Sequence, residues 1–125
     1  MGKKVLYIED NADNVLLVQR ALESRGYDFA WALNGLTGLA KAEANQPDLI
    51  MLDINLPDID GYEVARRIRT HAHLRAVPII AITANALKGD AEKALASGCD
   101  VYMSKPINIR ELWARLEACL ENSSA

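Results

Sequence analysis

The chain has 125 residues, half of them apolar and a quarter charged, which is typical of one soluble globular domain and excludes a disordered or fibrous protein. Its 17 acidic and 14 basic side chains give a net charge of -3, so we expect no direct DNA binding and no membrane contact. The separated cysteines, Cys99 and Cys119, predict buried free thiols in a reducing compartment. Since no apolar run resembles a signal peptide or a membrane span, we expect a cytoplasmic protein.

Five short apolar runs have the length of β-strands, and four of them can be buried on both faces, as in a parallel sheet. They cover residues 5–8, 29–33, 49–52, 79–82 and 101–103. The segments between and after these runs show helical spacing. Residues 37–44 show it more weakly, because most of their apolar side chains are alanine, and they are assigned to a helix because a crossover is needed there. The apolar stripes of the other four helices are Val15, Val18 and Leu22; Val64, Ala65 and Ile68; Leu87, Ala91, Ala94 and Leu95; and Ile109, Leu112, Leu116 and Leu120.

Local signals mark where these helices begin and end. Gly26, Gly98 and the pair Gln46-Pro47 lie where helices should stop. Asn108 followed by Glu111 resembles a capping box that opens the last helix, and residues 121–125 are expected to fray. No linker or repeat interrupts the pattern, so we expect a single domain over residues 1–125, although the same domain could be part of a longer protein.

Five βα units joined by right-handed crossovers predict an α/β fold with helices on both faces of a parallel sheet. The leading candidate is the flavodoxin-like, doubly wound, five-stranded sheet with strand order 2-1-3-4-5. In that order the first and third strands are neighbours, and the crevice beyond their carboxyl ends is where a binding site should lie.

Polar side chains stand where four of the five apolar runs end: Glu9 and Asp10, Asp53, Thr83, and Lys105. Three clustered carboxylates would raise one another's pKa values unless a cation compensates them, and oxygen ligands alone suit Mg²⁺. Lys105 and Thr83 add a cation and a hydroxyl that can reach a tetrahedral anion at Asp53. This combination indicates a phosphoryl-transfer site in which the Asp53 carboxylate acts as the nucleophile.

Four sequence segments that contain these residues together resemble those of a known family. The segments IED at 8–10, LDINLPDIDG at 52–61, ITA at 82–84 and YMSKP at 102–106 resemble the receiver domain of two-component response regulators, over essentially the whole chain. Two positions depart from the common pattern: Glu9 stands where many relatives have aspartate, and Val101 where a smaller residue is common. Neither departure threatens phosphorylation.

The resemblance implies a role for each motif residue. Asp53 would be the phosphoacceptor, Asp10 a direct Mg²⁺ ligand, Glu9 a ligand acting through water, and the backbone carbonyl of Asn55 a further ligand. The phosphate would be bound by Thr83, by the backbone N–H of Ala84 and by Lys105, and Tyr102 would be the switch aromatic. The side chains of Asn55 and Asn85 would tune dephosphorylation, and a cis peptide bond would precede Pro106.

The resemblance also implies a signalling switch that is not a dedicated enzyme but assists its own phosphorylation and dephosphorylation. The phosphodonor would be a sensor histidine kinase or a histidine phosphotransfer protein. The readout would be an unknown protein target at the face of the fourth helix, fifth strand and fifth helix. The domain would act as a monomer or as a phosphorylation-dependent dimer.

Two other classes of protein share parts of this pattern. Phosphatases of the haloacid dehalogenase type also use an aspartyl nucleophile, but they need a second aspartate two positions on, where this chain has Asn55. A binding module with the same fold but no phosphorylation is opposed by the complete set of acids, threonine and lysine. Taken singly, each residue has a structural alternative. Glu9 and Asp10 could cap a helix, Asp53 could be a turn residue, Thr83 could cap the fourth helix, and Lys105 could be a solvated cation.

Overall fold

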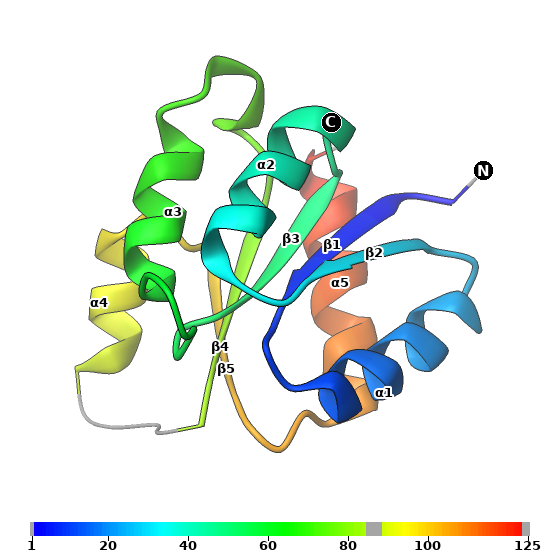
Figure 1. The fold of residues 1–125 in the computed structure, drawn as a ribbon. Helices are drawn as coiled ribbons and strands as arrows, with labels where there is room; N and C mark the ends of the chain where they lie inside the picture. Colours follow the sequence, from blue (N-terminus) through cyan, green and yellow to red (C-terminus); the bar gives the residue numbers. More distant parts are fainter. Residues whose placement is uncertain (1, 85–88, 124–125) are drawn as a thin grey trace.

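The computed structural model describes residues 2–84 and 89–123, and it forms one five-stranded parallel sheet flanked by helices (Figure 1). The strand order is β2-β1-β3-β4-β5, as predicted. The strands are β1 (Lys4–Ile8), β2 (Asp28–Ala32), β3 (Leu49–Asp53), β4 (Ile79–Thr83) and β5 (Val101–Ser104). The helices are α1 (Ala12–Glu23), α2 (Gly35–Asn45), α3 (Gly61–Arg69), α4 (Asp90–Ala96) and α5 (Ile109–Ser123), with a short 3-10 helix, η1 (Ala72–Leu74).

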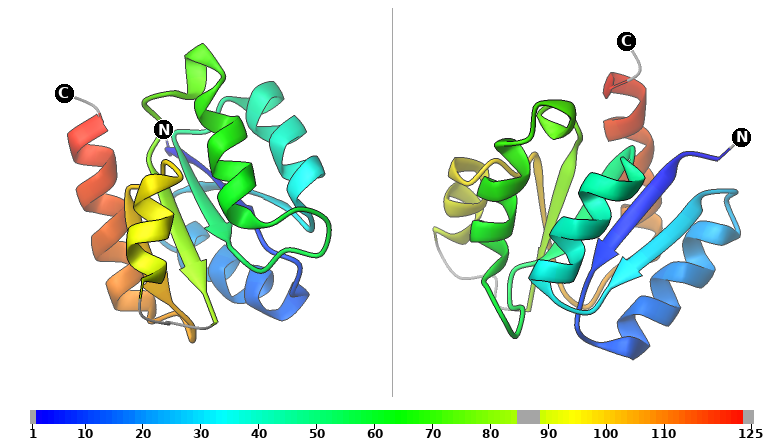
Figure 2. Two further views of the ribbon diagram at one scale, coloured as in Figure 1. Left: turned by 90° about the vertical axis from the view of Figure 1, so that its left-hand side faces the viewer. Right: turned by 45° about the horizontal axis from the view of Figure 1, so that its top comes forward.

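The sheet separates two hydrophobic cores, because successive side chains of a strand point to opposite faces. Helices α1 and α5 cover one face and α2, α3 and α4 the other, as the two views of Figure 2 show. On β1, Leu6 and Ile8 pack in the core of α2, α3 and α4, whereas Val5 and Tyr7 pack in the core of α1 and α5. The inner strands β3 and β4 are buried throughout, which explains their unbroken apolar runs.

The capping residues fix most helix ends close to the predicted positions. The Asn11 side chain accepts a hydrogen bond from the Asn14 N–H (3.0 Å) and opens α1. The Asn108 side chain accepts from the Glu111 N–H (2.9 Å), which confirms the predicted start of α5. Gln46 adopts a left-handed conformation (φ 47°) at the end of α2. Helix α5 continues to Ser123, past residue 121 where fraying was expected.

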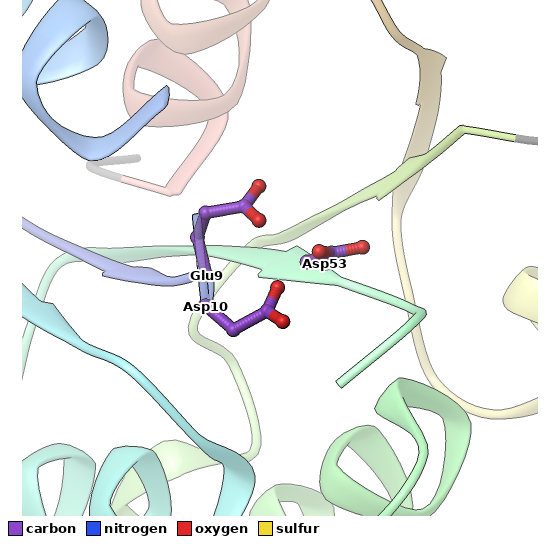
Figure 3. Close-up of side chains that lie close together, drawn as sticks. All are labelled: Glu9, Asp10 and Asp53. Atoms are coloured by element: carbon purple, nitrogen blue, oxygen red, sulfur yellow. The ribbon is translucent and has the colours of Figure 1, made fainter. Parts of the chain in front are cut away.

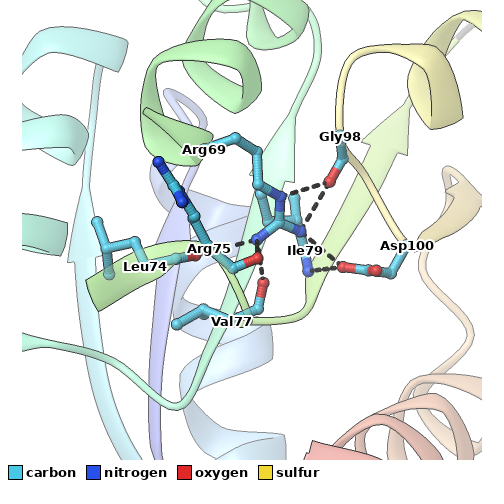
Figure 4. Close-up of polar contacts among 7 residues, drawn as sticks. All are labelled: Arg69, Leu74, Arg75, Val77, Ile79, Gly98 and Asp100. Atoms are coloured by element: carbon cyan, nitrogen blue, oxygen red, sulfur yellow. Dashed lines mark hydrogen bonds and ion pairs between the residues drawn. The ribbon is translucent and has the colours of Figure 1, made fainter. Parts of the chain in front are cut away.

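Arg69, the last residue of α3, joins two loops at the edge of the sheet opposite the predicted site (Figure 4). Its guanidinium donates to the carbonyls of Leu74, Arg75, Val77 and Gly98 at 2.6–3.1 Å and to the Asp100 carboxylate at 2.8 Å. Asp100 in turn accepts from the backbone N–H of Ile79 (2.9 Å). One side chain therefore satisfies the carbonyls that lead into β4 and those that follow α4.

None of the helices in the described parts of the chain is both long and apolar enough to span a membrane.

Candidate functional site

Three carboxylates meet at the carboxyl ends of β1 and β3, as the predicted strand order requires. Glu9 and Asp10 follow β1 directly, Asp53 ends β3, and β1 pairs with β3 in register from Val5–Leu49 to Ile8–Leu52. Figure 3 shows the three side chains close together, and each offers one oxygen that lies within 4.8 Å of the others. The expected acidic cluster is therefore present in the fold.

The three acids differ in their exposure to solvent. Glu9 is completely buried, Asp53 is 1% exposed, and Asp10 lies at the surface. Burying a carboxylate costs several kcal/mol, about 3–5 when a buried charge is left without its partner, so Glu9 and Asp53 need nearby donors or cations. Asp10 gives the cluster its opening to solvent.

Lys105, in the loop between β5 and α5, supplies a cation to both buried carboxylates. Its Nζ lies 2.9 Å from Glu9 Oε1 and 3.2 Å from Asp53 Oδ2. Burial alone would lower the pKa of Lys105, but the hydrogen bond to Glu9 and the charge of Asp53 outweigh burial and raise it. The lysine is therefore charged at neutral pH and bridges the two strands.

Glu9 has two further donors that the sequence analysis did not foresee. The Tyr7 hydroxyl donates to Glu9 Oε1 at 2.8 Å, and the backbone N–H of Asn11 donates to Oε2 at 3.2 Å. Burial, followed by the charge of Glu9, raises the pKa of the Tyr7 hydroxyl well above its ordinary value. A signal was available, because residues i and i+2 of a strand share a face, and Tyr7 and Glu9 are two positions apart.

Asp53 and the end of the neighbouring strand β4 complete the cluster. The backbone N–H of Asn55 donates to Asp53 Oδ1 at 3.0 Å, and the Asn55 side chain is exposed beside it. Thr83 is buried at the end of β4, where its register partner on β5 is Ser104, and Ala84 follows at the surface. The fourth strand thus delivers its hydroxyl residue to the same edge as the acids.

Tyr102 lies half-buried on β5, against the core of α2, α3 and α4. Its hydroxyl is buried and makes no hydrogen bond within the described residues. Burial, followed by the charge of Asp90, raises the pKa of this hydroxyl, while the nearby Thr83 side chain acts in the opposite direction. Tyr102 is thus close to Thr83 and inward-facing in this structure.

Two remaining expectations have different outcomes. The peptide bond between Lys105 and Pro106 is cis, as the resemblance implied. Asn85 lies outside the described residues. The backbone N–H of Lys105 donates to the Thr83 carbonyl (2.8 Å), which ties the loop that carries the lysine to the end of β4.

Two acidic residues in the loop between β3 and α3 have structural roles. Asp60 accepts a hydrogen bond from the Glu63 N–H (2.9 Å) and caps α3. Asp58 accepts from the Gly35 and Leu36 N–H groups (2.7 and 2.8 Å) and holds the start of α2. These backbone donors lower the pKa of Asp58, although burial opposes them.

The oxygen atoms of the acidic cluster fit a hard divalent cation. All three acidic side chains present oxygen, the ligand that Mg²⁺ prefers, and the exposed Asp10 leaves access for the ion and its waters. The charge of the cluster also fits, because one lysine compensates only part of three carboxylates.

A comparison with known protein families decides the assignment. The sequence profile of the response regulator receiver domain matches residues 5–117. The chain belongs to this family. It is therefore a receiver domain of two-component signalling, a phosphoacceptor switch by class, in keeping with the resemblance seen in the motifs.

Individual relatives of this receiver domain agree. It is 42% identical over 109 residues to the polar-differentiation response regulator DivK of Brucella anthropi, covering 87% of this chain and 89% of the relative. A receiver-domain protein from Methanospirillum hungatei, described as CheY-like, superposes with a TM-score of 0.93 at 27% identity, covering 99% and 98% of the two chains.

A third relative bears on the metal. The receiver domain of the sensor histidine kinase PA1611 of Pseudomonas aeruginosa is 38% identical with a TM-score of 0.89, covering 97% of this chain and 99% of that one. Its crystal structure has a magnesium ion coordinated in the active-site cleft.

Proposed function

We propose that this receiver domain accepts a phosphoryl group on Asp53 in the presence of Mg²⁺ and signals through protein contacts. The observation that carries the proposal is the convergence of Glu9, Asp10, Asp53 and Lys105 at one edge of the sheet. Compensation of two buried carboxylates would explain the lysine alone, but it gives no reason for a third, solvent-exposed carboxylate, Asp10, within 4.8 Å of them.

Each residue has a chemical role in this proposal. Asp10 would hold Mg²⁺ directly, with Asp53 and the backbone carbonyl of Asn55, and Glu9 would act through a bound water. The ion, when bound, neutralises charge on the phosphoryl oxygens. Asp53 is the nucleophile, and a bond forms from one of its oxygens to phosphorus as the bond to the donor's leaving atom breaks.

Lys105 has a second task once the phosphoryl group arrives. Its ammonium already lies 3.2 Å from Asp53 Oδ2, so a small movement brings it to a phosphoryl oxygen. Thr83 and the backbone N–H of Ala84, from the end of β4, would donate to the other oxygens. The acyl phosphate would thus be bound by groups from three strand ends.

Loss of the phosphoryl group would be slow compared with a dedicated phosphatase. The position two residues after Asp53 carries the amide of Asn55, which cannot transfer a proton as a carboxylic acid does. The side chains of Asn55 and Asn85 would set the access of attacking water. The domain therefore assists its own dephosphorylation without being an aspartyl-phosphate hydrolase.

The change at Asp53 has to reach a surface. One charge-assisted hydrogen bond contributes about 1.5–3 kcal/mol, whereas driving an equilibrium from 1:99 to 99:1 needs about 5.5 kcal/mol. We infer that Thr83 and Lys105 act together, drawing in the loop after β4 and letting Tyr102 rotate at the face of α4, β5 and α5. Thr83→Ala should then abolish the difference in partner affinity between the phosphorylated and unphosphorylated forms; an unchanged difference would contradict this coupling.

The proposed partners follow from the chemistry of the site. The phosphodonor is a sensor histidine kinase or a histidine phosphotransfer protein, and the output is an unidentified protein that binds the face of α4, β5 and α5. The phosphorylated form is a monomer or dimerises through that face.

The proposal is tested by intact-protein mass spectrometry after incubation with acetyl phosphate, with Mg²⁺ or with a chelator. We expect one added phosphoryl group that requires Mg²⁺ and is lost in Asp53→Asn. Inorganic phosphate is measured in the same samples, because rapid release without an adduct would indicate a hydrolase. The absence of both an adduct and phosphate release, with Mg²⁺ binding retained, would indicate an unphosphorylated binding module.

A further inference from the structure

The Tyr7 hydroxyl is a buried polar group that the proposed chemistry does not use, yet it reaches into the acidic cluster. Tyr7 lies on β1 and has no solvent exposure, and its ring packs edge-on against Phe29 with centroids 6.5 Å apart. Its hydroxyl donates to Glu9 Oε1 at 2.8 Å, and Glu9 is also completely buried. Neither partner of this hydrogen bond is therefore exposed to bulk solvent.

The hydrogen bonds of Glu9 divide between its two oxygens. Oε1 accepts from Tyr7 and lies 2.9 Å from Lys105 Nζ, while among the described residues Oε2 accepts only the longer bond from the Asn11 N–H (3.2 Å). Two strong donors on one oxygen fix the rotation of the carboxylate about its Cγ–Cδ bond. Oε2 is then the oxygen left with capacity to accept a bond from a metal-bound water.

We propose that Tyr7 is a positioning residue of the metal site, which holds the Glu9 carboxylate so that Oε2 faces the ion. The inference rests on the proposed function, since it assigns Glu9 to Mg²⁺ through water. Partners that orient a ligand from outside the coordination sphere typically change metal affinity about 10–100-fold when removed. Tyr7 differs from the site residues in touching neither the ion nor the phosphoryl group.

A side chain with only a packing role predicts something different. Tyr7→Phe keeps the ring and its contact with Phe29 and removes the hydroxyl, so packing is preserved. Glu9→Asp keeps the carboxylate but withdraws it by roughly 1.5 Å, one carbon–carbon bond, beyond good reach of the Tyr7 hydroxyl. If Tyr7 acts through Glu9, the two substitutions are coupled; if it acts through packing, they are independent.

The experiment is a double-mutant cycle in which Mg²⁺ affinity is the measured quantity. The affinity is obtained by titrating each variant with Mg²⁺ and monitoring the backbone amide signals of Asp10 and Asn11 in NMR spectra. We expect Tyr7→Phe to weaken Mg²⁺ binding about 10-fold in the otherwise unchanged chain. In the Glu9→Asp background it should change the affinity less than twofold. Tyr62→Phe, a buried tyrosine on α3 in the other core, is the matched control and should leave the affinity unchanged.

Two results would overturn the inference: an unchanged Mg²⁺ affinity in Tyr7→Phe, or an equal weakening in both backgrounds. Thermal unfolding of each variant shows that the fold is retained. Because Mg²⁺ binding needs no phosphodonor, this test is separate from that of the proposed function. A chain that binds Mg²⁺ with the expected coupling but is never phosphorylated would refute the function and leave the role of Tyr7 intact.

Discussion

Replacing Lys105 with methionine removes the cation that compensates two buried carboxylates while keeping most of the side-chain volume. Its Nζ lies 2.9 Å from Glu9 Oε1 and 3.2 Å from Asp53 Oδ2. At an effective dielectric constant of about 20, each contact corresponds to a gross attraction of about 5–6 kcal/mol, against which the desolvation of the lysine must be set. Removing one partner of a buried ion pair typically costs about 3–5 kcal/mol, and since Asp10 opens the cluster to water we expect about 3 kcal/mol here.

The assay for Lys105→Met is urea unfolding in the absence of Mg²⁺ and then at increasing Mg²⁺. A cation at the three carboxylates replaces the missing lysine charge. Mg²⁺ should therefore raise the free energy of unfolding of the variant more than that of the parent chain, and the difference in stability between the two proteins should shrink. A ligand present at 100 times its dissociation constant raises the free energy of unfolding by about 2.7 kcal/mol.

The matched control is Lys3→Met, which removes an exposed lysine outside the site and should change stability by less than about 0.5 kcal/mol. Two results would refute the reasoning. One is a loss of stability in Lys105→Met that is no larger than the loss in the control variant. The other is a difference from the parent chain that does not respond to Mg²⁺.

Three further predictions concern other parts of the fold. Gly61→Ala places a Cβ 2.6 Å from the Asp53 carbonyl oxygen, so the start of α3 must shift. We expect the free energy of unfolding in urea to fall by about 1–3 kcal/mol and Mg²⁺ to bind more weakly. Unchanged Mg²⁺ binding would contradict a link between the start of α3 and the metal site. Arg69→Met should cost about 2–3 kcal/mol while leaving Mg²⁺ affinity unaltered, because its hydrogen bonds lie at the opposite edge of the sheet; a stability within about 0.5 kcal/mol of the parent chain would refute its role. Burial raises the pKa of the Cys99 thiol from 9.0 to about 11. As the pH rises, the thiol therefore loses its proton in the unfolded chain before it does so in the folded chain. The stability due to Cys99 is fully present below pH 9 and falls by up to about 2.7 kcal/mol as the pH rises to 11. Cys99→Ala should flatten that part of the pH profile, measured by urea unfolding, and an identical slope in both proteins would show that the thiol is not buried as described.

The strand order and the convergence of the acids could be predicted because both follow from local patterns and general rules of topology. The apolar runs of β3 and β4 identify inner strands, and right-handed crossovers then place the ends of β1 and β3 side by side. Once this is known, Glu9, Asp10 and Asp53 must meet. The cap at Asn108 was equally local, since the donor it binds lies three residues away.

The contacts missed by the sequence analysis depend on tertiary distances, and strand periodicity indicates at most that two side chains share a face. The bond from Tyr7 to Glu9 also depends on how the tyrosine ring packs in the core of α1 and α5, where it meets Phe29 from β2 edge-on. The contacts of Arg69 with the Gly98 carbonyl span 29 positions, and nothing in an arginine at the end of a helix indicates where its guanidinium goes.

The most direct test of the account is to locate the phosphoryl group chemically. After incubation with acetyl phosphate and Mg²⁺, borohydride reduces an aspartyl phosphate to homoserine, and peptide mass spectrometry then identifies the converted residue. The account predicts conversion at Asp53, dependent on Mg²⁺, and none at Asp10 or Glu9. Conversion at another acid, or a phosphorylated protein in which Asp53 remains aspartate, would contradict it.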